Sequence, residues 1–241
     1  MTVKPYNEEG ATKKGEVKNM FNTIAPRYDL LNHLLSLGID KSWRTKAINT
    51  LKHLNNPKVL DVATGTGDLA IKAHNILKCP IIGSDLSAGM LEIARDKVKQ
   101  LGLENMITFA EADSEALPFS DNQFDAVTVA FGVRNYENLD KGLSEMARVI
   151  RSGGQMVILE FSKPKHFPFK QIYMFYFKYI LPFMGGLISR DRKAYEYLPQ
   201  SVLAFPDGEA FEEHLRNAGI TPQRRISLTC GIATIYVGLK Q

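Results

Sequence analysis

The chain has 241 residues, of which 44% are hydrophobic and 23% are charged, which excludes a disordered or fibrous protein and fits a soluble globular one. Its formal net charge of +4 is compatible with an anionic membrane surface or with nucleic acid but demonstrates neither. Its two cysteines, Cys79 and Cys230, form no disulfide or metal-binding pattern, so we expect a cytoplasmic protein without a metal site.

The chain opens with a polar segment that is followed by a helical region. Residues 1–16 lack the apolar core of a signal peptide. From Val17 to Leu35 the apolar residues recur at helical spacing, with breaks expected at Pro26 and Gly38. We therefore predict a helical cap over about residues 16–55. No low-complexity linker follows it, so we treat residues 1–241 as a single domain.

Short β-rich runs alternate with helical stretches in the middle of the chain. We predict strands at 57–63, 80–86, 106–113, 124–132 and 153–161. The predicted helices are one that ends near Leu77, one at 87–102 with Ser87 as its N-cap, and one at 138–150. Strands that alternate with helices indicate a parallel, doubly wound α/β sheet with helices on both faces.

The pattern changes after residue 161. Residues 162–207 are aromatic and contain five prolines, so we predict an insertion there. A helix at 208–218 and two strands, near 221–228 and 231–239, end the chain. Because only the short connection LTCG joins these strands, we expect an antiparallel pair and hence a seven-stranded sheet.

Within the insertion, residues 172–189 (IYMFYFKYILPFMGGLIS) are strongly apolar. Lys178 and Pro182 interrupt the run, which argues against a membrane-spanning helix. Two interpretations stay open. The aromatic residues pack on the core, or they form an apolar lid that receives a lipophilic substrate or contacts the bilayer interface.

A glycine loop, VLDVATGTGDLA, joins the first strand to the helix after it. Gly65 and Gly67 allow a tight turn and the close approach of a ligand to the backbone. Asp85 and Leu86 end the second strand, where a carboxylate can bind ribose hydroxyls. The pattern fits two cofactors, a nicotinamide dinucleotide and S-adenosylmethionine.

Charge favours S-adenosylmethionine. Asp61 precedes the glycine loop and Asp68 follows it, and both would repel a pyrophosphate at the start of the helix. S-adenosylmethionine carries a sulfonium and an ammonium group, which acidic neighbours favour. Asp113 and Ser114 follow the third strand and could bind the adenine amino group. These groups would then form a nucleoside site along the carboxyl edge of the sheet.

Five blocks together resemble the UbiE/MenG C-methyltransferases of quinone biosynthesis: VLDVATGTGD, GSDLSAGML, EALPFSDNQFDAVTVAFGVRN, GGQMVILEFSKP and AYEYLPQSVLAFP. Residues 25–44 match the N-terminal pattern of that family as well. The resemblance covers about residues 15–240, and its most specific blocks are FGVRN, LEFSKP and YEYLPQS. It implies a Rossmann-like class I methyltransferase fold with S-adenosylmethionine as cofactor.

The resemblance also implies particular donor contacts and a reaction. The donor would be bound through Thr66, Asp85 and the pair Asp113–Ser114. A further contact of the family, often a serine, falls on Ala130 in this chain. The family methylates a ring carbon of a polyprenylated quinol. We prefer demethylmenaquinol, with the benzoquinol precursor of ubiquinone as the alternative.

Arg134 and Asn135, directly after the fourth strand, are our candidates for the reaction itself. A ring carbon becomes nucleophilic when the adjacent hydroxyl loses its proton, and Arg134 can stabilise the phenolate as a fixed cation. Asn135 can fix a quinol oxygen or the donor carboxylate. A surface ion pair of Arg134 with Glu137 or Asp140 is the alternative interpretation.

The proton acceptor is less well specified. His33 has an intrinsic pKa suited to a base, although a lone histidine in an apolar helix is more often a packed core residue. Tyr28 and Asp29 would close over the donor from the N-terminal cap. From the insertion, Asp191, Tyr195 and Tyr197 could face the acceptor, and water is a further candidate.

Other functions fit the sequence less well. A methyltransferase for a soluble small molecule would need no apolar lid. A nucleic-acid methyltransferase would need a basic face and a base-extruding motif after the fourth strand, where FGVRN stands instead. A non-catalytic NAD-binding or nucleoside-binding protein belongs to a different class. We expect a quinol as partner, a transient contact with the inner face of the membrane, and no pattern that specifies an oligomeric state.

Overall fold

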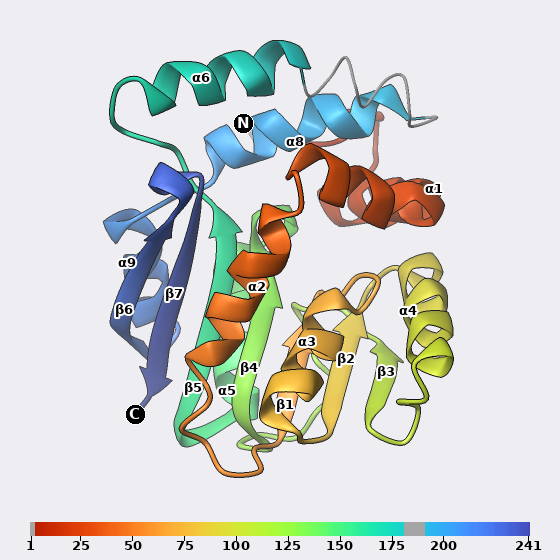
Figure 1. Ribbon diagram of the computed structural model, residues 1–241, viewed down its shortest axis with the longest axis vertical. Helices are drawn as coiled ribbons and strands as arrows, with labels where there is room; N and C mark the ends of the chain where they lie inside the picture. Colours follow the sequence, from red (N-terminus) through yellow and green to blue (C-terminus); the bar gives the residue numbers. More distant parts are fainter. Residues whose placement is uncertain (1–2, 181–190) are drawn as a thin grey trace.

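The computed structural model describes residues 3–180 and 191–241, without the side chains of residues 31–35, 177, 178, 192 and 195. The strands are β1 (Val59–Val62), β2 (Ile81–Asp85), β3 (Ile107–Glu111), β4 (Phe124–Ala130), β5 (Ile150–Phe161), β6 (Ile220–Leu228) and β7 (Ala233–Lys240). They form one sheet in the order β3-β2-β1-β4-β5-β7-β6 (Figure 1). The first five pair in parallel, and β7 runs antiparallel between β5 and β6. The predicted seven-stranded architecture is confirmed.

The helices are α1 (Lys13–Leu35), α2 (Ile39–Asn49), α3 (Asp68–Leu77), α4 (Ala88–Gln100), α5 (Leu139–Val149), α6 (Phe169–Phe175), α8 (Arg192–Ala204) and α9 (Glu209–Asn217). The short turns are η1 (Val133–Asn135), η2 (Tyr176–Ile180) and η3 (Thr229–Gly231). Ser87 caps α4 as predicted, because its hydroxyl accepts the Met90 N–H at 3.3 Å.

One prediction about the helices was wrong. Pro26 lies inside α1 and does not end it. Proline removes one helical hydrogen bond, which is costly in an isolated helix. Here Met20, Ile24 and Ala25 are buried against Met90 of α4 and Tyr197 of α8, so tertiary packing keeps the helix continuous. The break predicted at Gly38 is present, since this residue has a φ of 74° between α1 and α2.

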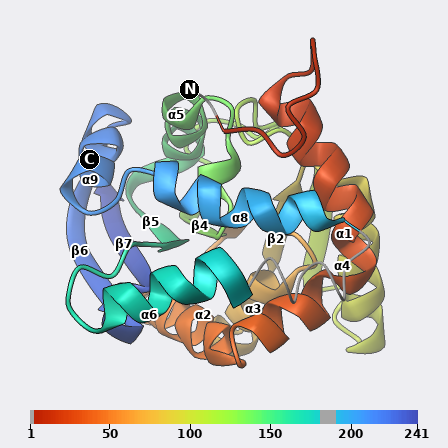
Figure 2. The same cartoon turned by 90° about the horizontal axis from the view of Figure 1, so that it is seen from above.

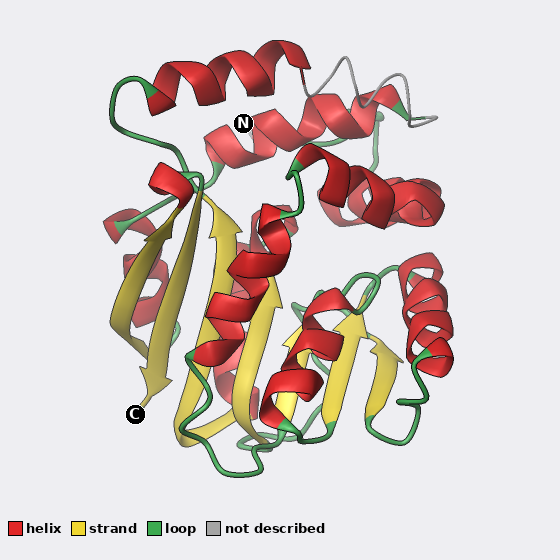
Figure 3. Cartoon of the chain, in the orientation of Figure 1, coloured by secondary structure: helices red, strands yellow, loops and turns green. Residues whose placement is uncertain are grey.

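Helices cover both faces of the sheet (Figure 3). On one face α2, α3 and α4 bury Ile48, Leu69 and Val98 against the strands. On the other face α5 and α9 bury Leu143 and Phe211. Because β4 lies in the middle of the sheet between β1 and β5, it is covered from both sides. This explains why its sequence is apolar almost without interruption.

The remaining helices cover the carboxyl ends of the parallel strands. Figures 1 and 2 show α1, α6 and α8 lying across this edge. α1 and α8 share a small core that contains Met20, Ala194 and Tyr197. Below them the ends of β1 and β4 come so close that a Cβ on Gly132 would lie 2.7 Å from the Cβ of Ala63. The chain therefore needs glycine where it turns into η1.

Candidate active site

A first cavity opens at the carboxyl ends of β1, β2 and β4, below α1. It is lined by six of the residues that the sequence assigned to a cofactor: Gly65, Asp85, Leu86, Asp113, Ser114 and Ala130. Gly65 has a φ of +57°, and a Cβ built on it would meet no atom within 4 Å. The turn thus leaves open space directly above the backbone, where a ligand can approach it.

Asp85 organises the floor of this cavity. One carboxylate oxygen accepts the Gly65 N–H at 2.8 Å, and the other accepts the Ser87 N–H at 2.8 Å. Burial raises the pKa of Asp85, and the hydrogen bonds from Ser87 and Gly65 oppose that shift. The carboxylate therefore joins the glycine loop to the start of α4 and retains lone pairs that can accept hydrogen bonds from a ligand.

Asp113 and Ser114 begin the loop between β3 and β4. Lys14 of α1 reaches over this loop, with its ammonium 2.7 Å from Asp113 and 3.0 Å from Glu115. Glu115 also accepts the Glu137 N–H at 2.9 Å, which ties the loop to the chain after η1. These contacts thus join α1 and two strand-end loops, all of which contribute to the lining of the cavity.

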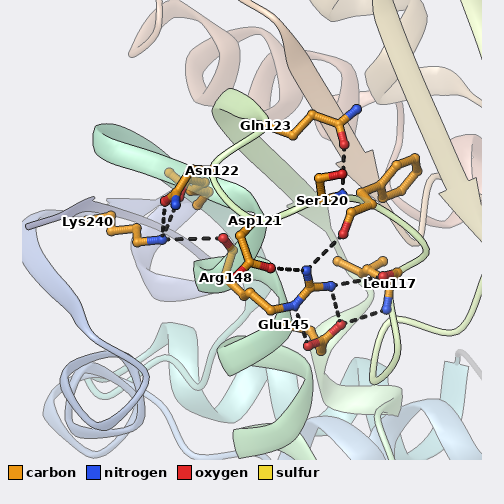
Figure 4. A network of polar contacts seen from close by, with 10 residues as sticks. Leu117, Ser120, Asp121, Asn122, Gln123, Glu145, Arg148 and Lys240 are labelled. Atoms are coloured by element: carbon orange, nitrogen blue, oxygen red, sulfur yellow. Dashed lines mark hydrogen bonds and ion pairs between the residues drawn. The ribbon is translucent and has the colours of Figure 1, made fainter.

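Arg148 of α5 holds the far side of the same loop (Figure 4). Its guanidinium donates to the carbonyls of Leu117 and Phe119 at 2.9 and 2.8 Å, and it pairs with Asp121 at 2.7 Å. Glu145 completes the arrangement by pairing with Arg148 and accepting the Leu117 N–H at 2.8 Å. These contacts fix the loop that carries Asp113 and Ser114.

Three predicted cofactor residues lie outside the lining that the described residues form. Asp61 is fully buried, where it accepts hydrogen bonds from Thr64 at 2.5 Å and Thr128 at 2.8 Å. Thr66 donates to Asp29 of α1 at 2.5 Å. Gly67 has a φ of 81° at the start of α3 and packs closely against Ala94 and Phe109. These three residues thus fix the conformation of the loop through its contacts with β4, α1 and α4.

The sequence attributed the preference for a cationic cofactor to Asp61 and Asp68, but in the structure other residues make the cavity acidic. Lys97 lies 2.6 Å from Asp68 and offsets its charge, and Asp61 is buried away from the cavity. The acidic character of the cavity comes instead from Asp85, Asp113, Glu115 and Glu137, against the two cations Lys14 and Lys18. This excess of carboxylates suits a cationic ligand.

A second and larger cavity adjoins the first. Its volume is about 260 Å³, compared with about 80 Å³ for the first. Phe21, Tyr28, Phe131 and Asn135 line both cavities, so a ligand in one can meet a ligand in the other. Most of the other residues that line it are apolar or aromatic and come from α1, α2, α6 and α8.

Aromatic rings and two arginines form one wall of the second cavity. The rings of Phe131 and Phe161 lie 4.5 Å apart between their centroids. Arg44 lies over the outer face of this pair at 5.5 Å from the Phe131 ring, and Arg134 lies 5.3 Å from the Phe161 ring. Arg44 also forms a buried ion pair with Asp40. The wall is aromatic with positive charge beside it, which suits an aromatic ligand.

Arg134 and Asn135 both line the second cavity, as members of η1. Arg134 pairs with Glu160 of β5 at 2.8 Å, and not with Glu137 or Asp140 as the alternative interpretation required. Its side chain is only 7% exposed. Its Nε has no hydrogen-bond partner among the residues that the structure describes. A buried donor of this kind needs a partner, and a ligand in the cavity can supply one.

The amide of Asn135 has a defined orientation. The Tyr197 hydroxyl donates to its Oδ1 at 3.1 Å, and its Nδ2 donates to the Phe131 carbonyl at 3.4 Å. Arg134 also donates to this carbonyl, and Phe131 adopts a left-handed φ of 59°. Lys13 donates to the Arg134 and Tyr136 carbonyls at 3.0 and 2.8 Å. Tyr197, Phe131 and Lys13 thus hold the turn that presents Arg134 and Asn135.

The candidate bases are less well placed. Asp191 caps the start of α8, where it accepts the Tyr6 hydroxyl and the Ala194 N–H, and it lies outside the described lining of both cavities. His33 belongs to α1, but its side chain lies outside the described residues, as does that of Tyr195. Tyr28 lines both cavities and Tyr197 lines the second.

Sequence reasoning missed Glu160 and the contribution of α2. A carboxylate inside the apolar strand run GGQMVILEF was a signal for Glu160, because a buried acid requires a partner. Trp43 and Arg44 lie on α2 next to Phe131, and Trp43 is the one tryptophan of the sequence. Spacing gave no reason to place them at this cavity, because the contact depends on how α2 packs.

The fold and the two cavities define a class I methyltransferase. A SAM-dependent methyltransferase of Thermotoga maritima has the same fold, with a TM-score of 0.66 and 16% identity over 92% of this chain and 99% of that one. The family model for the ubiE/COQ5 methyltransferase family matches residues 9–240. The chain belongs to this family.

Two curated relatives are similar over almost their whole length. Demethylmenaquinone methyltransferase of Bacteroides fragilis is 51% identical over 239 residues, which cover 99% of this chain and 97% of the relative. The UbiE ubiquinone/menaquinone biosynthesis C-methyltransferase of Geotalea daltonii is 46% identical over 232 residues, 95% of this chain and 98% of the relative. The chain is an S-adenosylmethionine-dependent methyltransferase of quinone biosynthesis, so the family decides between the two cofactors that the glycine loop left open.

The residues of the first cavity fit this cofactor. The space above Gly65 admits a ligand against the backbone, and the acidic lining suits the sulfonium and ammonium groups. No group of three His, Cys, Asp or Glu side chains in the described part of the chain could hold a metal ion.

Proposed function

We propose that this enzyme methylates a ring carbon of a polyprenylated quinol, with demethylmenaquinol as its substrate. The observation that carries the proposal is the large apolar cavity beside the first cavity, which we take as the site of the methyl donor. The large cavity is lined by the buried guanidinium of Arg134, whose Nε–H has no hydrogen-bond partner among the described residues. The names of both relatives support a quinone precursor. The alternative substrate is the benzoquinol precursor of ubiquinone, because the name of the Geotalea relative includes ubiquinone biosynthesis.

In this proposal the donor is held by Gly65, Asp85, Leu86, Asp113, Ser114 and Ala130, at the ends of three neighbouring strands. Asp85 accepts hydrogen bonds from ribose hydroxyls, and Asp113 or Ser114 contacts the adenine. Asp61, Thr66 and Gly67 fix the conformation of the glycine loop and contact no donor atom. When bound, S-adenosylmethionine supplies an electrophilic methyl group on a positively charged sulfur.

Arg134 and Asn135 act on the acceptor. Arg134 remains protonated, so it stabilises the phenolate that forms when the quinol hydroxyl loses its proton. Asn135 adds an N–H donor, because Tyr197 holds its Oδ1 and leaves Nδ2 directed to the Phe131 carbonyl and the cavity. Among the described residues, Asp40 is the one carboxylate in the lining of the second cavity, and it pairs with Arg44. We therefore propose that water accepts the proton, in preference to His33 or Asp191.

We further propose that the enzyme works in the cytoplasm and touches the inner membrane surface transiently. The described part of the chain contains no helix that is long and apolar enough to cross a membrane. α6 and its flanks nevertheless expose large apolar side chains, with Phe167 81%, Ile172 61% and Phe175 59% exposed. Leu37 and Ile39, at the second cavity, are exposed as well. Such a surface allows a membrane-dissolved isoprenoid substrate to reach the cavity.

Substitution of Arg134 by alanine tests the proposed function. We expect the variant to bind S-adenosylmethionine with unchanged affinity in calorimetry and to lose about 100-fold or more of the methyl transfer to demethylmenaquinol. Arg151→Ala is the matched control, because Arg151 is 57% exposed and forms a surface ion pair with Asp125.

The same assay compares three acceptors: demethylmenaquinol, the ubiquinone precursor and a tail-less naphthol. A near-normal rate in the Arg134 variant would refute the catalytic role, and equal rates on the tail-less acceptor would refute the polyprenylated substrate. A preference for the benzoquinol would transfer the proposal to the alternative substrate.

A further inference from the structure

Glu160 is a carboxylate inside the apolar part of a central strand. Residues 155–160 of β5 are all buried, and Glu160 has no exposed surface. Burial raises the pKa of its carboxyl group, and the nearby Arg134 is the largest influence in the opposite direction. Such a residue is expensive to bury, and a buried ion pair is by itself weak support for stability. Its position therefore calls for an explanation in terms of what it does to Arg134.

The carboxylate is itself held rigidly. Its Oε1 accepts the Phe161 N–H of its own strand at 2.8 Å, and Oε2 lies 3.4 Å from the Arg134 N–H. The Arg134 Nη1 then donates to Oε1 at 2.8 Å and to the Phe131 carbonyl. Nη1 has two protons, and these two acceptors use both. The guanidinium is thus fixed at one corner by groups that belong to β5 and to the end of β4.

The opposite part of the guanidinium remains available. Nε is buried and has no hydrogen-bond partner among the residues that the structure describes. The Phe161 ring lies 5.3 Å from the central carbon of the guanidinium. Because Glu160 and the Phe131 carbonyl fix Nη1, they also determine which way the remaining donors point.

We propose that Glu160 is a positioning residue, which fixes the Arg134 guanidinium so that its unused donors face the quinol oxygen. The inference rests on the proposed function of Arg134. Glu160 does not line the described cavity and touches no reacting atom, so its effect on the reaction passes through Arg134. A fixed donor stabilises a developing charge without reorganisation, whereas a loosely held one must be ordered during the reaction.

Two substitutions test how Glu160 holds Arg134. Glu160→Gln removes the charge from the hydrogen bond to Nη1, while Glu160→Asp keeps the charge and withdraws the carboxylate by one methylene. Because each change loosens the hold on Nη1, both variants should lose about 10- to 100-fold in kcat, with the KM for the quinol and the calorimetric Kd for S-adenosylmethionine within about threefold of the wild type. Glu212→Gln is the matched control, since Glu212 is a buried carboxylate that pairs with Arg225 away from both cavities.

A double-mutant cycle tests whether Glu160 acts through Arg134. In an Arg134→Lys background with a measurable residual rate, Glu160→Gln should change kcat by less than about twofold. The melting temperature of every variant, measured with and without S-adenosylmethionine, shows whether it folds. If Glu160→Gln does not fold, Glu160→Asp replaces it in the cycle.

Normal kcat in both Glu160 variants beside an inactive Arg134→Ala overturns this inference and leaves the proposed function intact. Full additivity in the cycle also overturns it, because Glu160 would then act independently of Arg134. Near-normal activity of Arg134→Ala overturns the proposed function and this inference with it.

Discussion

Asp61 is a buried acid at the start of the glycine loop. Its carboxylate is fully buried and is hydrogen-bonded to the hydroxyls of Thr64 and Thr128. Burial is the largest influence on its pKa and raises it from 3.8 to about 6, although both threonines oppose the shift. The native state therefore holds a proton on Asp61 at pH values where the unfolded chain has released it.

This pKa shift predicts a specific pH dependence of stability. Between about pH 4 and pH 6 the native state binds more protons at Asp61 than the unfolded state, so the contribution of this residue to stability decreases as the pH rises through that range. Asp61→Asn does not titrate and can still bond to both threonine hydroxyls. We expect its melting temperature to rise relative to the wild type from pH 4.5 to pH 6.5 and then to keep a constant difference. A difference independent of pH throughout would show that Asp61 does not titrate in this range.

The single residues of the site could be predicted to different extents. Asp85, Asp113, Arg134 and Asn135 lie at or shortly after the ends of strands, and strand ends can be located from the pattern of the sequence. Their partners could not be located in this way. Glu160 is 26 residues from Arg134, and Tyr197 is 62 residues from Asn135. Such pairs form only when β5 and α8 pack beside η1.

At the scale of elements, the loop between β3 and β4 connects α5 to the cavity that we propose for the methyl donor. Asp113 and Ser114, near the start of the loop, line that cavity, and the later part of the loop is held by Arg148 of α5 (Figure 4). The backbone carbonyls of Leu117 and Phe119 both depend on this one side chain for hydrogen bonds across the gap to α5. A change at the far end of the loop should therefore be felt at the donor cavity.

We predict that Arg148→Ala weakens donor binding without changing the chemical step. The lost hydrogen bonds should cost about 1–3 kcal/mol of unfolding free energy, because they are charged bonds to backbone carbonyls. The Kd for S-adenosylmethionine should rise severalfold, while kcat at saturating donor stays near the wild-type value. Arg216→Ala on α9 is the control, since the described partners of this arginine within hydrogen-bond distance are acids of its own helix. An unchanged Kd for S-adenosylmethionine would contradict the prediction, because Arg148 would then hold the loop without affecting the binding of the methyl donor.

The alternation of strands and helices could be predicted from local sequence patterns, since the central strands are apolar and the connections carry turn or cap residues. The arrangement of α1, α6 and α8 over the strand ends could not be predicted in this way. Pro26 suggested a break in α1 that tertiary packing removes. The aromatic insertion left two interpretations open. Tyr173 packs on the core beside Val202, whereas Phe175 is exposed, and the lid or membrane contact stays a prediction.

At the scale of the whole molecule, α1, α6 and α8 lie across the carboxyl ends of the parallel strands (Figure 2). The cavity that we propose for the methyl donor lies under α1 and is acidic, and the larger cavity lies among α1, α2, α6 and α8 and is apolar. The two ligands would therefore bind to opposite sides of the residues that both cavities share. An aqueous donor and a lipid-soluble acceptor can then meet while each stays in a suitable environment.

The exposed apolar face of α6 leads to a prediction about the membrane. Ile172 and Phe175 are 61% and 59% exposed, and Lys165 and Lys170 nearby are exposed cations that suit an anionic lipid surface. Replacing Ile172 and Phe175 together by serine removes apolar surface without disturbing the buried Tyr173. We expect about tenfold weaker co-sedimentation with vesicles that contain anionic lipid.

The same variant should lose activity only where the substrate is in a bilayer. We expect kcat/KM for a long-tailed quinol in vesicles to fall by about the factor lost in vesicle binding, and kcat/KM for a short-tailed quinol in solution to stay unchanged. Leu101→Ser is the matched control, because Leu101 is 56% exposed at the end of α4, at the opposite edge of the sheet from the cavities. Equal losses on both substrates would place α6 in the active site itself. Unchanged vesicle binding and unchanged activity would mean that the apolar face of α6 serves no membrane contact.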